Sequence, residues 1–409
     1  MTAVNIRTSS PRPLVSLLGP AFVAAIAYVD PGNVAANVAA GADYGFLLVW
    51  VIVVANLMAC LVQYLSAKLG VVSGMTLPEA VGARLSKPSR IAYWAQAEVV
   101  AMATDLAEVV GGAIALHLLF GLPPLVGGVL TGVVSMVLLL MKDREGQRAF
   151  ERMIIGLLSI IAVGFLAGLV IAPPEAGDVV GGLLPRFHGT GSVLIAAAML
   201  GATVMPHAVY LHSGLAKDRH GPVDARQRGQ LLRATRWDVG FAMVLAGTVN
   251  LAMLLVAAQN LQGVTGVDSI ESAHAAISER VGPLAGLCLA VGLLASGLAS
   301  SSVGAYAGAM IMHGLLRSKI PLLARRLVTL APALVVIALG ANLSEALVLS
   351  QVVLSFGIPF ALIPLVRLTS DPLIMGESVN TKTTLGLGWL IAILISGLNI
   401  LLIWLTVKS

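Results

Sequence analysis

Apolar stretches long enough to cross a lipid bilayer recur along the whole of this 409-residue chain. A membrane-spanning helix needs about 20 mainly apolar residues. Hydrophobic residues make up 58% of the chain and charged residues 11%, whereas a soluble domain has roughly 45–50% apolar and about 25% charged residues. The sequence therefore predicts an all-α integral membrane protein, with residues 1–409 in a single transmembrane domain. Eleven spans are expected, beginning near Leu17, Leu47, Ala92, Leu125, Met153, Val193, Asp238, Pro283, Arg326, Leu343 and Leu385.

The connections between these spans divide the basic residues unevenly. If the N-terminus is cytoplasmic, all but three of the 25 lysines and arginines lie inside, the exceptions being Arg186, Arg280 and Lys408. Such an excess of positive charge on the cytoplasmic side is typical of membrane proteins. The distribution predicts a multi-pass protein of the plasma membrane with a cytoplasmic N-terminus and, after an odd number of spans, a C-terminus outside. Topology thus explains the net charge of +5, and nucleic acid is not an expected partner.

Two of the predicted spans are interrupted at corresponding places. Asp30-Pro31-Gly32-Asn33 lies within the first span, and Met205-Pro206-His207 lies within the sixth, five spans later. Proline removes a backbone donor and glycine loosens a helix, so both segments should break near the middle of the membrane. Simple bending is the alternative, because these residues are common in membrane helices. The polar side chains at both breaks favour an inverted-repeat transporter whose site lies at the interruptions.

The residues around the breaks are suited to holding a metal cation. A carboxylate at the centre of a membrane helix is costly, which makes Asp30 the first functional candidate. Asn33 would add a second oxygen, and the carbonyls of Ala27 and Ala202, just before the breaks, carry the negative end of the helix dipole. Met205 would supply a soft thioether, which Mn²⁺, Fe²⁺, Co²⁺ and Cd²⁺ tolerate better than Mg²⁺ or Ca²⁺ do. Packing is the more common role of a methionine in a membrane helix.

Titratable side chains near the breaks indicate a route for protons. The imidazole of His207 suits proton exchange near neutral pH, and binding the metal is its alternative role. Asp105 and Glu108 stand at i and i+3, on one face of the third span. They predict either a proton path or buried salt bridges to a basic residue such as Arg325 or Arg326, and the two interpretations are compatible.

Three further polar residues lie within the predicted spans, namely Gln351, Asn250 and Thr203. Side chains of this kind more often form hydrogen bonds between membrane helices than bind a ligand.

The interrupted spans closely resemble those of the Nramp family of proton-coupled divalent metal transporters. The resemblance rests on Asp30-Pro-Gly-Asn33, on Ala202-Thr-Val-Met205-Pro-His207 and on Thr104-Asp-Leu-Ala-Glu-Val-Val-Gly111, and it extends over essentially the whole chain. It implies a LeuT-like fold with broken helices 1 and 6, inverted five-helix repeats at about 14–172 and 189–366, and an extra helix at about 384–406. One departure is Ala208-Val209 after His207, where the family is expected to have Asn-Leu.

The resemblance also implies roles for particular residues. In the inward-facing state the metal would be held by Asp30, Asn33, Met205 and the carbonyl of Ala202, and in other states it would be joined by the carbonyl of Ala27 and by Gln351. The proton route would run through Asp30, Glu108, Asp105 and His207 towards Arg326.

Residues and resemblance together predict a secondary active transporter and not an enzyme. It would import Mn²⁺ and Fe²⁺, and also Cd²⁺ and Co²⁺, coupled to protons by alternating access, and would exclude Ca²⁺ and Mg²⁺. The expected partners are these ions, protons and the lipid bilayer, with no cofactor, and a monomer is expected.

Other classes of membrane protein fit the sequence less well. A sodium-coupled organic-solute carrier of the same fold is the main alternative, but an aromatic content of only 5% is low for an organic site. An intramembrane metalloprotease is disfavoured because the sequence has no His-Glu-x-x-His. The sequence does not distinguish a channel from a carrier.

Overall fold

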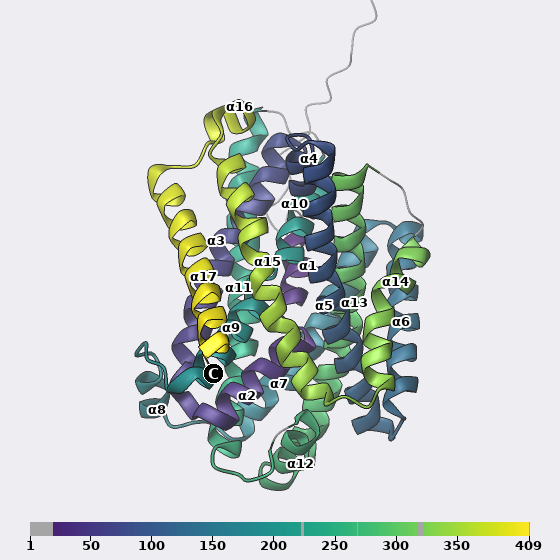
Figure 1. The fold of residues 1–409 in the computed structure, drawn as a ribbon, viewed down its shortest axis with the longest axis vertical. Coiled ribbons are helices and arrows are strands. Elements are labelled where there is room, and N and C mark those ends of the chain that lie inside the picture. Colours follow the sequence, from purple (N-terminus) through teal and green to yellow (C-terminus); the bar gives the residue numbers. More distant parts are fainter. Residues whose placement is uncertain (1–18, 222–224, 268, 318–321, 409) are drawn as a thin grey trace, which may run out of the picture.

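The fold is a bundle of helices packed side by side (Figure 1). The computed structural model describes residues 19–221, 225–267, 269–317 and 322–408, and every regular element in these ranges is a helix. This agrees with the predicted all-α class. The elements are α1 (Pro20–Ala25), η2 (Ile26–Val29), α2 (Pro31–Tyr44), η3 (Gly45–Leu48), α3 (Val49–Ser73), α4 (Leu77–Gly82), α5 (Lys87–Phe120), α6 (Pro124–Glu145), α7 (Gln147–Ile171), α8 (Ala176–Gly181), α9 (Gly189–Thr203), α10 (Pro206–His220), α11 (Ala225–Leu261), α12 (Ile270–Arg280), α13 (Pro283–Leu316), α14 (Leu322–Ala338), α15 (Leu343–Thr369), α16 (Pro372–Met375), η4 (Gly376–Ser378) and α17 (Lys382–Lys408).

Many of these helices are long and apolar enough to cross a membrane. Within the described ranges eight segments meet both requirements, and two shorter apolar helices accompany them, Pro20–Val29 and Pro124–Leu140. Ten of the eleven predicted span starts lie within a helix, and Leu17 lies outside the described residues. The count of eleven crossings and the inverted repeats at 14–172 and 189–366 stay predictions.

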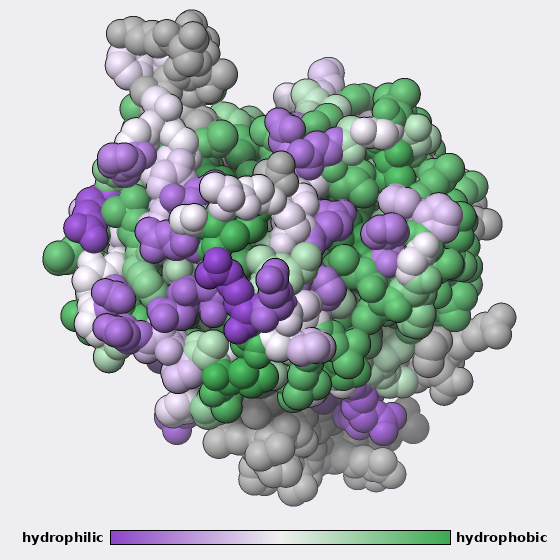
Figure 2. Space-filling view, turned by 90° about the horizontal axis from the view of Figure 1, so that it is seen from below, coloured by the Kyte–Doolittle hydropathy of each residue, from purple (hydrophilic) through white to green (hydrophobic). Residues whose placement is uncertain are grey.

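The distribution of polarity is the reverse of that in a soluble protein. Charged side chains such as Asp30, Glu108 and Arg326 are buried inside the bundle. Large apolar side chains are exposed on its outside, among them Leu57, Val163, Val170, Ile393 and Ile400. Figure 2 looks at the lower end of the molecule, where hydrophilic residues gather across the end face and apolar residues form its flanks. Such a surface suits lipid around the sides and water at the ends.

Two discontinuous helices occupy the centre of the bundle. The first consists of α1, η2 and α2, and the second of α9 and α10; η2 and α2 pack against α9, and α3, α13 and α15 contact both discontinuous helices. The approach to the first break is close, because a side chain at Gly111 of α5 would overlap the ring of Pro31. The short helices α4 and α16 lie at one end of the molecule, and α8 and α12 lie at the other (Figure 1).

Candidate metal site at the two broken helices

The first break follows from the Asp30-Pro31 sequence. η2 ends at Val29, Asp30 is extended with ψ of 169°, and α2 begins at Pro31. Asp30 caps α2, since its Oδ1 accepts the backbone N–H of Asn33 at 2.8 Å, and proline is favoured at the first helical position. Proline has no N–H to donate to the carbonyl four residues earlier. Pro31 therefore leaves the carbonyl of Ala27 without a helical donor.

The second break has the same construction. α9 ends at Thr203, Met205 is extended with ψ of 122°, and α10 begins at Pro206. Pro206 stands four residues after Ala202, so the Ala202 carbonyl also lacks its helical donor. Each break thus frees one carbonyl, and these are the two carbonyls that the sequence singled out.

The side-chain amide of Asn33 joins the two breaks. Its Nδ2 donates to the carbonyl of Ala202 at 2.9 Å, to Oδ1 of Asp30 at 2.8 Å and, at 3.5 Å, to the carbonyl of Ala27. The second carboxylate oxygen of Asp30 is buried and has no hydrogen-bond partner among the described residues. Three of the predicted metal ligands therefore contact the amide of a fourth, Asn33.

Gln351 of α15 lies against the first break. A Cβ at Gly32 would overlap the Gln351 carboxamide, so this side chain touches the backbone between Asp30 and Asn33. Gln351 is fully buried, and its Nε2 donates to Oγ of Ser350 at 3.1 Å. Its Oε1 has no hydrogen-bond partner in the described part of the chain, which leaves this oxygen free to bind a ligand.

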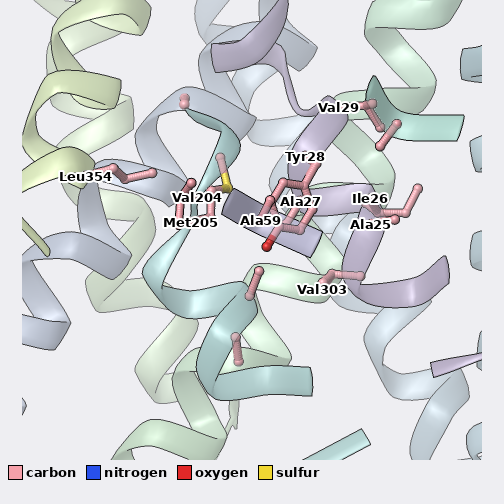
Figure 3. Packing of buried hydrophobic residues seen from close by; sticks show 14 of the residues in the cluster. Ala25, Ile26, Ala27, Tyr28, Val29, Ala59, Val204, Met205, Val303 and Leu354 are labelled. Carbon is pink, nitrogen blue, oxygen red and sulfur yellow. The ribbon is translucent and has the colours of Figure 1, made fainter. Parts of the chain in front are cut away.

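Met205 brings a sulfur atom to the same region. It is fully buried in the cluster that contains Ala27 and Tyr28. Figure 3 shows its sulfur between Val204 and these two residues of η2. The sequence that breaks the second helix therefore also directs a thioether towards the first.

The available ligand types decide which cation this region suits. Over residues 19–221, 225–267, 269–317 and 322–408, no three His, Cys, Asp or Glu side chains gather closely enough to hold a metal ion. A metal at the breaks would thus be held by one carboxylate with carbonyl, amide and thioether groups. This mixture of hard oxygen and soft sulfur suits a first-row divalent ion and gives little advantage to Ca²⁺ or Mg²⁺.

The two acids of α5 have different surroundings. Asp105 forms a buried ion pair with Arg326, which also donates to Oγ of Ser135 at 3.1 Å and to Oγ of Ser301. Both carboxyl oxygens of Glu108 are buried and have no hydrogen-bond partner among the described residues. The salt-bridge interpretation therefore holds for Asp105, with Arg326 as its partner, and Glu108 forms no such pair with a described residue.

His207 lies beside α5, in the first turn of α10. Its Nδ1 is 3.2 Å from Oγ1 of Thr104, the residue before Asp105, and its Nε2 has no hydrogen-bond partner in the described ranges. His207 and Asp105 thus lie near one another, and a proton-accepting nitrogen remains available.

Sequence reasoning missed some of the buried polar groups. Glu98 pairs with Arg325 at 3.1 Å, and its position seven residues before Asp105, on the same face of α5, was the signal that could have found it. Gln63 links the hydroxyl of Tyr28 to Nδ1 of His212, which lies 2.6 Å from the Gln63 carboxamide oxygen. No local pattern in the sequence indicates that second contact.

Of these two lesser polar candidates, Asn250 has the bridging role expected of it and Thr203 does not. Asn250 donates to the carbonyl of Tyr28 at 2.7 Å and accepts from Asn37 at 3.0 Å. Thr203 donates back to the carbonyl of Met199 at 2.7 Å, within its own helix. Ala208 and Val209, where the family is expected to have Asn-Leu, are buried apolar residues.

Known proteins resemble this chain over nearly its full length. Residues 21–405 match the family model Nramp, described as natural resistance-associated macrophage protein-like. The divalent metal cation transporter MntH of Mycobacterium tuberculosis (strain ATCC 25618 / H37Rv) is 63% identical over 394 residues, which cover 96% of this chain and 92% of that protein.

Solved structures resemble the fold as well. The manganese transporter of Eremococcus coleocola superposes with a TM-score of 0.86 at 30% identity, covering 98% of this chain and 90% of that chain. Mhp1, a nucleobase-cation-symport-1 family transporter, superposes with a TM-score of 0.60 at 18% identity, covering 90% of this chain and 81% of that one. This second similarity concerns the fold alone and agrees with the predicted LeuT-like architecture.

Proposed function

Because this chain belongs to the Nramp family of divalent metal cation transporters, we propose that it imports transition metal ions such as Mn²⁺ and Fe²⁺ together with protons. Family membership makes it a multi-pass membrane transporter and not an enzyme. The metal ions, their coupling to protons and the exclusion of Ca²⁺ and Mg²⁺ are the parts that we propose.

The observation that carries the proposal is that two carbonyls without a helical donor and one carboxylate meet at the amide of Asn33. Ala27 and Ala202 face the same amide that contacts Asp30. A divalent cation placed among these oxygens would be neutralised in part by Asp30 and would replace hydration by carbonyl contacts. Met205 and Gln351 would complete the coordination, and the sulfur supports selection of Mn²⁺, Fe²⁺, Co²⁺ and Cd²⁺ over the alkaline earth ions.

The proton route that we propose begins at Asp30 and passes through Glu108. The unpartnered Glu108 carboxyl and the free Nε2 of His207 are groups able to accept a proton. The Asp105–Arg326 pair would receive the proton next. Protonating Asp105 would weaken its ion pair with the guanidinium, and the proton could then leave towards the cytoplasm.

Transport would proceed by alternating access between the two inverted repeats. We propose that the end bearing α4 and α16 is cytoplasmic, since Arg84, Lys87 and Lys217 lie near it, and that the end bearing α8 and α12 faces outside. Such a topology brings the N-terminus inside and the C-terminus outside. One chain contains all the ligands named above, so a monomer suffices.

The proposal is tested by Mn²⁺ uptake into proteoliposomes loaded with a pH-sensitive dye. Saturable uptake accompanied by internal acidification is expected, with excess Ca²⁺ having little effect. Asp30→Ala should abolish both signals, and Asp43→Ala, which removes a carboxylate from the far end of α2, is the matched control. Uptake that survives Asp30→Ala, or that proceeds without acidification when a proton gradient drives it, would contradict the proposal.

A further inference from the structure

The helix that carries Gln351 contains two prolines of its own. Pro359 and Pro364 lie inside α15, and each lacks the N–H that would bond to the carbonyl four residues earlier. The carbonyls of Ser355 and Phe360 are therefore freed by the same geometry that frees Ala27 and Ala202 at the breaks. In α15, however, the helix continues through both positions.

The first freed carbonyl is bound by a side chain from α17. Nδ2 of Asn399 donates to the Ser355 carbonyl at 2.8 Å, and Oγ of Ser355 has two acceptors for its one proton, Oδ1 of Asn399 at 2.8 Å and the Val352 carbonyl at 2.7 Å. Both residues are buried. An asparagine in an otherwise apolar membrane helix is costly without partners, so this reciprocal pair explains why α17 carries one.

The second freed carbonyl is bound by a side chain from α5. The hydroxyl of Tyr93 donates to the Phe360 carbonyl, and the two rings meet edge to face with centroids 6.5 Å apart. The Tyr93 oxygen is also 2.9 Å from the hydroxyl of Tyr210 on α10. Because the single Tyr93 proton is used at Phe360, Tyr210 donates to Tyr93, and α10 is linked to α15 through this hydroxyl.

These contacts lie close to the candidate metal site. Ser355 is one helical turn after Gln351, and the backbone of this turn presses against α9, where a Cβ at Gly201 would overlap the Gln351 carbonyl. On its other side, Gln351 touches Gly32 in the first break. Any change in the path of α15 at Pro359 would therefore move the Gln351 carboxamide relative to Asp30.

We propose that Asn399 and Tyr93 are positioning residues that fix the path of α15 at its two prolines and thereby hold Gln351 at the metal. This inference rests on the proposed function, in which Gln351 contributes to the metal site. Tyr93 further couples α15 at Pro364 to α10, the half-helix that begins at Pro206, directly after Met205. The two side chains replace the backbone donors that the prolines remove, and they come from helices outside the pair of broken ones.

The decisive experiment restores the missing backbone donor. In Pro359→Ala the alanine N–H can bond to the Ser355 carbonyl, so Asn399 is no longer needed there. Asn399→Ala alone should raise the half-saturating Mn²⁺ concentration by about three- to tenfold, the effect of one buried hydrogen bond. Added to Pro359→Ala, the same substitution should change it by less than about twofold. Asn260→Ala is the control, because the Asn260 amide donates to Val256 within its own helix.

Tyr93→Phe and Pro364→Ala form a second, independent double-mutant cycle at the other proline of α15. The phenylalanine keeps the ring contact and removes only the hydroxyl, so a folding failure in one cycle leaves the other informative. The proposal would be overturned if, in both cycles, the side-chain substitution raised the half-saturating Mn²⁺ concentration by the same factor in the proline and alanine backgrounds.

A third comparison separates positioning from general stabilisation. Because Asn399 acts through Gln351, adding Asn399→Ala to Gln351→Ala should leave the half-saturating Mn²⁺ concentration unchanged. If Asn399 only stabilised the bundle, the double variant would have a higher half-saturating concentration than Gln351→Ala alone. Wild-type protein that fails to bind Mn²⁺ at all, measured by calorimetry in detergent, would overturn the proposed function. Wild-type binding with no loss in Asn399→Ala or Tyr93→Phe would overturn only this inference.

Discussion

Replacing Glu108 by glutamine and Asp105 by asparagine makes the same chemical change twice on one helix, three residues apart. The structure predicts opposite consequences for stability. Asp105 is paired with Arg326 in the interior, and removing one partner of a buried ion pair costs about 3–5 kcal/mol. Glu108 has no ion pair with a described residue to lose. A buried carboxyl without an ionic partner is expected to be protonated, so its amide variant leaves the charge of the folded protein unchanged.

The two variants are therefore expected to differ in both stability and transport. Asp105→Asn should be destabilised by more than about 100-fold in the ratio of folded to unfolded protein, which is the value that 3 kcal/mol represents. Glu108→Gln should be as stable as the wild type or more stable. In proteoliposomes Glu108→Gln should reduce proton movement more than Mn²⁺ movement, because glutamine cannot carry a proton but keeps the shape of the side chain.

The assay combines thermal unfolding of the detergent-solubilised protein with paired measurements of Mn²⁺ uptake and internal acidification. Ser159→Ala, at an exposed hydroxyl of α7 that bonds only within its own helix, serves as the control for substitution in a span. Equal destabilisation by the two changes would show that Glu108 has an ionic partner after all. Equal loss of metal and proton movement in Glu108→Gln would refute its place on the proton route.

Two further predictions concern the metal ligands. Met205→Ala should relax selectivity, so that Ca²⁺ competes with Mn²⁺ uptake while some Mn²⁺ transport remains, because the thioether discriminates by softness; unchanged exclusion of Ca²⁺ would refute the role of the sulfur. Gly32→Ala should weaken Mn²⁺ binding to about the same degree as Gln351→Ala, because the added Cβ displaces the flexible Gln351 carboxamide; the double variant should bind no more weakly than either single one, and additive losses measured by calorimetry would show that the methyl group acts elsewhere.

The broken helices could be predicted from the sequence because their cause is local. Proline at 31 and 206 ends hydrogen bonding to Ala27 and Ala202 whatever the rest of the chain does, and the polar residues next to each proline marked the breaks as a candidate site. Their meeting in space was inferred from the symmetry of the two positions, and the contacts of Asn33 bear it out.

The pairing of distant charges could not be read in the same way. Arg325 and Arg326 are neighbours in sequence, but they lie on different faces of α14 and reach Glu98 and Asp105 respectively. Which arginine meets which acid depends on the register between α5 and α14, and apolar periodicity leaves that register open. For the same reason Asn399 and Tyr93 gave no signal, since their partners are backbone carbonyls on another helix.

The Asn33 amide has a consequence for the unloaded carrier. After a carrier releases its metal ion, the empty binding site must return to the outward-facing state. At that stage the Asp30 carboxylate and the two bare carbonyls would repel one another. The NH₂ group of Asn33 contacts all three of these oxygens, so it supplies the partial positive charge that the cargo otherwise brings. Rotating the same amide by half a turn presents its oxygen to an arriving cation. In the proposed transport cycle, the Asn33 amide would therefore take the place of the metal while the empty site returns to the outside.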